Sequence, residues 1–132
     1  MQIKTVEIAE KLQQTKLGNH LAGQLIRSST ATALNYGEAQ AVESPNDFIP
    51  KMKVILKELR ETRVRFKIII RKPLLPKKEI ENVLQENNEL IAIFLKSIDT
   101  AKEIKANHKI RIICYSNFII PYWLLFIFCL KT

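Results

Sequence analysis

The clearest candidates for a binding function are lysines and arginines in the middle of the chain. Most of them recur at steps of three, four or seven residues, which places them on one side of an α-helix. The candidate binding residues are Lys53, Lys57, Arg60, Arg63, Lys67 and Arg71. Such a row can follow a phosphate backbone, because each neutralised phosphate releases counterions. A solvated helix face interleaved with Glu58 and Glu61 fits the same pattern, and few aromatic residues accompany it for base stacking.

The overall charge points in the same direction as this row. The chain carries 21 Lys and Arg against 13 Asp and Glu, a formal net charge of +8. A surface potential of this sign favours anionic partners such as RNA, DNA or lipid headgroups. Excess charge also serves solubility, so a protein-interaction or scaffold module that does not bind nucleic acid remains an alternative.

Residues for catalysis or metal binding do not occur in a recognisable arrangement. His20 and His108 are far apart in sequence and in no metal-ligand spacing. Ser28 and Ser29 have no evident His and acid partners, and the chain contains no glycine-rich phosphate loop. We therefore expect no enzyme activity, no catalytic residues, no metal and no cofactor.

The hydrophobic pattern predicts four helices, over about residues 2–14, 20–41, 45–72 and 77–105. Apolar residues recur at helical spacing in each, and no credible alternating strand pattern precedes residue 110. Short connections favour antiparallel neighbours. The predicted fold class is all-α, an antiparallel up-down-up-down four-helix bundle with an apolar C-terminal extension.

Two helix starts carry cap signals. Asn19 is suited to cap the second helix, and Ser44 followed by Pro45 and Asp47 is the sharpest start signal in the chain. The second helix is rich in Ala, Ser, Thr and Gly. Small side chains of this kind suit a helix at the centre of a bundle or one packed against another subunit.

Long polar side chains among those small residues require partners. An antiparallel hairpin with its turn near residues 42–44 places Arg27 level with Glu58 and Glu61, and Glu38 level with Lys51. Because buried charges are costly unless paired, we expect Arg27 to pair with Glu58 or Glu61, and Glu38 with Lys51, in structural contacts.

The carboxyl-terminal segment differs in composition from the rest. No charged residue occurs from Ile112 to Leu130, and the segment contains both cysteines, Cys114 and Cys129, which indicate neither a disulfide framework nor a metal site. A membrane anchor, an apolar appendage that packs on the bundle or in an oligomer, and an extension without a selected role all fit; we favour the last. We assign residues 1–107 to the bundle domain and 108–132 to this tail. No signal peptide is evident, so a cytoplasmic location is expected, with membrane attachment through 112–130 as the alternative.

Several motifs in order resemble one known family. They are Gly18-Asn19-His20-Leu21-Ala22-Gly23-Gln24-Leu25-Ile26-Arg27-Ser28, Asn35-Tyr36-Gly37-Glu38-Ala39-Gln40, Leu56-Lys57-Glu58-Leu59-Arg60-Glu61-Thr62 and Glu89-Leu90-Ile91-Ala92-Ile93-Phe94, with Glu43-Ser44 and Asp47-Phe48-Ile49 between them. Over about residues 3–105 the chain resembles the bacterial four helix bundle proteins. These are also called intervening-sequence or ribosomal-protein-like proteins, because some are encoded in inserts of large-subunit rRNA genes.

The resemblance implies an antiparallel bundle that assembles into a ring-like homo-oligomer, for example a pentamer, without established catalytic residues. The family is similar to the accessory protein of diversity-generating retroelements, a basic oligomeric bundle that engages nucleic acid and a reverse transcriptase. This kinship adds weight to nucleic-acid binding. The chain departs from the family pattern in a shorter first helix and in the tail after Asn107.

Overall fold

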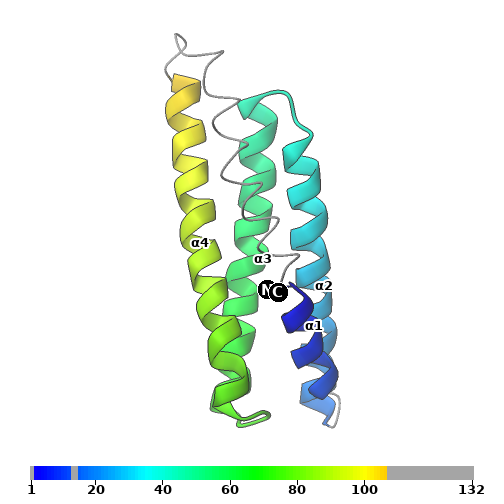
Figure 1. Ribbon diagram of the computed structural model, residues 1–132. Coiled ribbons are helices and arrows are strands. Elements are labelled where there is room, and N and C mark those ends of the chain that lie inside the picture. The colour runs from blue at the N-terminus through cyan, green and yellow to red at the C-terminus, as the bar shows by residue number, and fades with distance from the viewer. Residues whose placement is uncertain (1, 13–14, 107–132) are drawn as a thin grey trace.

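The computed structural model describes residues 2–12 and 15–106, which form four α-helices. These are α1 (Gln2–Lys11), α2 (Lys16–Gln40), α3 (Pro45–Arg71) and α4 (Lys77–Ala106). Successive helices run in opposite directions, and α3 packs against both α2 and α4 (Figure 1). The structure confirms the predicted antiparallel four-helix bundle.

The start of α3 follows the predicted cap. Ser44 has extended backbone angles, and its side chain accepts a hydrogen bond from the backbone N–H of Asp47 at 3.2 Å. The Ser44 hydroxyl in turn donates to Asp47 Oδ2 at 2.6 Å. Pro45 occupies the first helical position, where its missing N–H costs no helix hydrogen bond.

The predicted start of α2 was wrong by one turn. Thr15, not Asn19, is the N-cap, and its hydroxyl accepts from the Gly18 N–H at 2.9 Å. Gly18, which precedes the predicted start of the helix, is buried in the first turn of α2. A Cβ built at Gly18 would overlap the carbonyl oxygen of Leu12. Glycine therefore allows the end of α1 to lie directly against the start of α2.

The core consists mainly of the predicted apolar stripes. On α3 and α4 the buried stripe residues are Met52, Ile55, Leu56, Leu59, Phe66, Ile69, Ile80, Val83, Ile91, Phe94, Ile98 and Ala101. Tyr36 of α2 packs edge-on against Phe94, with ring centroids 5.9 Å apart and an interplanar angle of 80°. This contact joins α2 to α4 across the bundle.

Polar residues also occupy the core, which the hydrophobic pattern did not indicate. Asn87 is fully buried, and its Nδ2 donates to the carbonyl oxygen of Leu59 at 3.1 Å. Thr32 is buried as well and donates to the Ser28 carbonyl oxygen one turn earlier at 2.8 Å. Because the Thr32 hydroxyl is satisfied within its own helix, α2 can place this small polar residue against its neighbours.

The first helix, α1, has 10 residues, whereas the other helices have 25 to 30. It lies along the lower part of α2 (Figure 1). Two ion pairs tie α1 to α4: Lys4 to Glu86 and Lys11 to Glu79, each at 2.6 Å. Partial burial of Glu86 would raise its pKa, but the hydrogen bond and charge of Lys4 help to outweigh that effect, so the pKa lies below its usual value.

Several predictions fall on residues that the structure does not describe. The assignment of 108–132 as a separate tail, the two cysteines and His108 all lie outside the described residues. Among residues 2–12 and 15–106, no helix is both long enough and apolar enough to cross a membrane.

Candidate nucleic-acid interface

The predicted cations of α3 lie on one side of that helix, the side next to α4. We call them the basic stripe: Lys53, Lys57, Arg60, Arg63, Lys67 and Arg71. All are exposed except Arg63, which is half-buried. Lys53 and Arg60 border a groove shared with α4, and Lys67 and Arg71 follow Arg60 at helical steps of seven and four. The side of α3 next to α2 carries other residues, Lys51 and Arg65.

Most of the basic stripe has no acidic partner in the described part of the chain. Lys57 Nζ lies 3.9 Å from Glu61 Oε1, at the outer limit of an ion pair. The remaining members form no ion pair with a described carboxylate. From Lys53 to Arg71 the stripe extends about 27 Å along the helix, at a rise of about 1.5 Å per residue. The stripe is therefore a line of cations free to meet an external anion.

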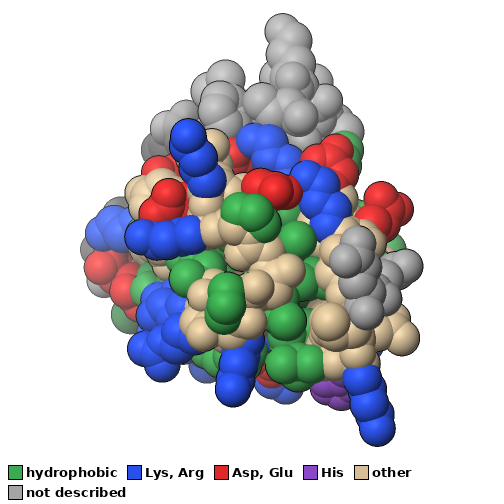
Figure 2. Space-filling view, turned by 90° about the horizontal axis from the view of Figure 1, so that it is seen from below, with side chains coloured by type: hydrophobic (Ala, Val, Ile, Leu, Met, Phe, Trp, Pro, Cys, Tyr) green, Lys and Arg blue, Asp and Glu red, His purple; other side chains and the backbone are tan. Residues whose placement is uncertain are grey.

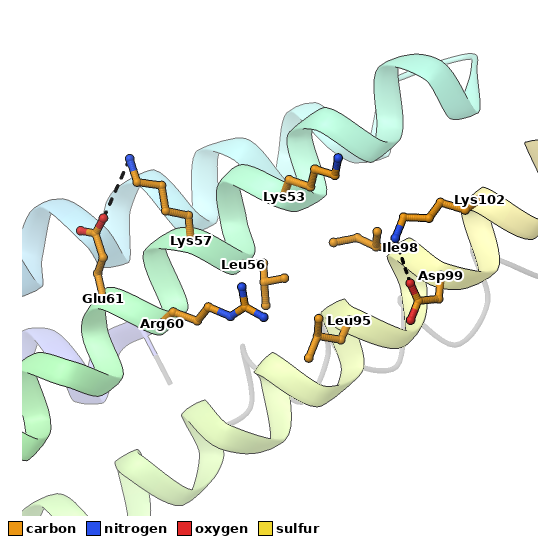
Figure 3. A pocket seen from close by; sticks show the side chains of 9 residues that line it. All are labelled: Lys53, Leu56, Lys57, Arg60, Glu61, Leu95, Ile98, Asp99 and Lys102. Atoms are coloured by element: carbon orange, nitrogen blue, oxygen red, sulfur yellow. Dashed lines mark hydrogen bonds and ion pairs between the residues drawn. The ribbon is translucent and has the colours of Figure 1, made fainter.

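Between α3 and α4 the surface is hollowed into a groove of about 440 Å³. We call it the α3–α4 groove; its lining residues are Lys53, Leu56, Lys57, Arg60, Glu61, Leu95, Ile98, Asp99 and Lys102. Figure 3 shows the Arg60 side chain extending toward α4, with its guanidinium beside Leu56 and Leu95. Asp99 is paired within the groove, since Lys102 Nζ lies 3.1 Å from its Oδ1.

One of the two predicted polar pairs is present in the structure and the other is not. Lys51 donates to Glu38, so the expected contact between α3 and α2 is present. The pairing of Arg27 was wrong: its guanidinium is exposed and donates to Gln24 of its own helix at 2.7 Å. Glu58 forms no ion pair with a described residue.

The arginine that joins α2 and α3 is Arg65. Its side chain is only 13% exposed, and it donates to Ser28 Oγ at 2.8 Å and to Glu61 Oε2 at 2.8 Å. Arg27 could not take this role because it points away from α3, whereas Ser28, the next residue, points toward it. The antiparallel register predicted the level of these residues along the bundle but not the direction in which Arg27 points.

A second surface of interest lies on α2. Exposed small and apolar residues recur there at helical spacing, and we call them the α2 outer face: Gly23, Ile26, Thr30, Ala33, Leu34 and Gly37. Leu34 is 64% exposed. A Cβ built at Gly23 or Gly37 would meet no atom within 4 Å. Between Arg27 and Glu38 this helix carries no charged residue.

Positive charge also gathers at one end of the bundle. Figure 2 views the end of the bundle where α3 ends and α4 begins, and Lys and Arg side chains project around much of its border. Among the described residues no group of three His, Cys, Asp or Glu side chains is placed to hold a metal ion.

Comparison with known proteins supports the architecture. No family model and no curated protein matches the chain. Its fold is similar to the crystal structure of a protein of unknown function from the S23 ribosomal protein family of Bacteroides thetaiotaomicron. The two share 25% sequence identity and a TM-score of 0.68, over 74% of this chain and 90% of the other. Fold and surface together define a basic antiparallel four-helix bundle, similar to this S23-family protein.

Proposed function

We propose that this protein is a non-enzymatic, homo-oligomeric module that binds RNA or DNA through the basic stripe of α3. The observation that carries the proposal is a line of mostly exposed cations, all of which except Lys57 form no ion pair with a described carboxylate. A solvated helix face usually interleaves acids with its bases at steps of three and four, which neutralises it locally. On α3, Glu61 is engaged mainly by Arg65, at 2.8 Å, and lies 3.9 Å from Lys57. Glu58 lies on the side away from α4. These two acids therefore leave the other cations of the stripe without an ion pair.

The spacing of the stripe supports a polyanion as the partner. Consecutive members are three or four residues apart, which corresponds to about 4.5–6 Å along the helix axis. Cations at this spacing can contact successive phosphates of one strand, and contacts to the sugar-phosphate backbone carry no sequence information. We therefore expect binding that depends strongly on salt and weakly on sequence.

Charge reversal within the stripe tests this function. We expect the triple variant Lys53→Glu, Lys57→Glu, Arg60→Glu to lose at least about tenfold in affinity for a short RNA at moderate salt, measured by fluorescence anisotropy. The matched control is Lys16→Glu, Lys96→Glu, Lys105→Glu, which changes the net charge by the same amount at exposed positions on α2 and α4. Equal losses in both variants would mean that the total charge attracts RNA and that the stripe is no site.

Self-association is proposed through the α2 outer face. Because the chain carries a net charge of +8, two copies repel each other wherever charged surfaces meet, and the uncharged stretch of this face between Arg27 and Glu38 reduces that cost. The exposed glycines allow close backbone approach, and Leu34 provides apolar area.

A single charge on this face tests the assembly. We expect Leu34→Glu to shift the protein to monomer in size-exclusion chromatography with light scattering, whereas Ile3→Glu, an exposed position on α1, leaves the oligomer intact. A monomeric wild-type protein at micromolar concentration, or an unchanged oligomer in Leu34→Glu, would refute the proposed interface.

Purification distinguishes the alternative, a protein-interaction or scaffold module. If the protein carries host nucleic acid, the ratio of absorbance at 260 and 280 nm falls after nuclease treatment. A partner protein that remains bound after nuclease treatment, from a preparation without nucleic acid, would favour the scaffold role.

A further inference from the structure

The α3–α4 groove combines an apolar floor with a cationic rim. Leu56 and Ile98 form its deep part and are 6% and 3% exposed. Leu95 is 38% exposed and provides apolar surface that solvent can reach. Phosphate contacts require only the cations of the rim. The floor therefore offers an apolar contact, whereas the basic stripe offers contacts to phosphates.

The cations of the rim differ in whether they form ion pairs with carboxylates. Lys102 is held by Asp99 at 3.1 Å, and Lys57 lies 3.9 Å from Glu61. Lys53 and Arg60 form no ion pair with a described residue, and Figure 3 draws no interaction from either. The Arg60 guanidinium lies beside the floor at Leu56 and Leu95 (Figure 3). A ligand on the floor would thus meet a planar cation at its edge.

The dimensions favour one unpaired nucleotide over a duplex. A volume of about 440 Å³ lies in the range of small-ligand sites. A duplex keeps its bases stacked inside and presents its phosphates, so it can touch the rim but not the floor. In a single strand the bases can turn outward, rest on apolar surface and stack against an arginine plane.

We propose that the α3–α4 groove seats one unpaired base of a single-stranded RNA or DNA on Leu56, Leu95 and Ile98, with Lys53 and Arg60 on the flanking phosphates. This inference rests on the proposed function and adds a ligand class to it. The module prefers single strands, loops and bulges over duplexes of the same charge, without a strong preference for any base.

The test compares probes that differ only in the presence or pairing of their bases. Binding of the full chain is measured by anisotropy at one salt concentration to a labelled single-stranded DNA of about 12 nucleotides, to a strand of the same length with abasic residues, and to the matching duplex. We expect the strand with bases to bind about five- to tenfold more tightly than the abasic strand. Equal affinity for the strands with and without bases overturns the inference.

Variants locate the effect in the groove. We expect Leu95→Gln to weaken binding of the strand with bases several-fold and to leave binding of the abasic strand unchanged. The control Ile3→Gln removes an exposed apolar side chain from α1 and should change neither. Both positions are partly solvated, so the fold should persist, as circular dichroism would verify. An unchanged preference for bases in Leu95→Gln would refute the assignment to this groove.

The outcomes separate the inference from the proposed function. If none of the three probes binds even at low salt, the proposed function fails and this inference fails with it. If all three bind with affinities that follow charge alone, the proposed function stands and only the base-binding groove is wrong.

Discussion

The junction of α1 and α2 gives a sharp test of the packing. In Gly18→Ala the new Cβ would overlap the Leu12 carbonyl oxygen, and it would lie 2.9 Å from Thr15 Oγ1. Both obstacles belong to the connection between the helices, since Leu12 directly follows α1 and Thr15 caps α2. Relief requires a shift of backbone, not a rotamer change. We expect a loss of about 2–4 kcal/mol in the free energy of unfolding, at the upper end of overpacking costs.

The matched control is Gly23→Ala, five residues later in the same helix. A Cβ there meets nothing within 4 Å, so only helix propensity changes. We expect a gain of about 0.5–1 kcal/mol. Urea unfolding followed by circular dichroism measures both variants, at a dilution where light scattering shows monomer, because Gly23 belongs to the α2 outer face. A loss below about 0.5 kcal/mol in Gly18→Ala would refute the close approach of α1 to α2.

Two further predictions concern the contacts between helices. Arg65→Leu should lower the free energy of unfolding by about 1–3 kcal/mol, because Ser28 and Glu61 lose their hydrogen-bond donor. The control Arg27→Leu, at an exposed site, should change it by no more than about 0.5 kcal/mol. Equal losses for the two variants in urea unfolding would contradict the assignment of Arg65. The lowered pKa of Glu86 means that its pair with Lys4 stabilises the fold above the pKa of the unfolded chain and is lost as pH falls through the folded value. Glu86→Gln should therefore lower the free energy of unfolding by about 0.5–1 kcal/mol at neutral pH, and its stability should fall less steeply than that of the wild type as the pH is lowered. Parallel curves of stability against pH for the two proteins, from pH 7 to pH 3, would contradict this.

Local signals predicted α3 and α4 well because their boundaries depend on residues close in sequence. Ser44, Pro45 and Asp47 form a self-contained cap that needs no other part of the molecule. At the start of α2 two residues could serve as cap, Thr15 and Asn19. Thr15 is the cap because Gly18 packs against Leu12, which directly follows α1, and the cap signals alone do not contain this contact.

Contacts across helices were predictable only in part. The antiparallel register correctly placed Glu38 level with Lys51, but a pairing also depends on the direction in which a side chain leaves its helix. One residue of offset turns a side chain by about 100°, which separates Arg27 from the contact that Arg65 makes with Ser28. The α3–α4 groove was missed because its floor combines Leu56 with Leu95 from a different helix. The periodic spacing of Lys and Arg on α3 was the part of the candidate site that the sequence could indicate.

The salt dependence of RNA binding is the decisive measurement for the basic stripe. If about five cations of the stripe neutralise phosphates of a single strand, a plot of log affinity against log salt should have a slope near −3.5. In the variant Lys53→Glu, Lys57→Glu, Arg60→Glu the slope should become shallower by about 2, and in the control Lys16→Glu, Lys96→Glu, Lys105→Glu it should stay close to that of the wild type. Absence of binding at low salt, or the same slope in all three proteins, would contradict the assignment of the basic stripe as a nucleic-acid interface.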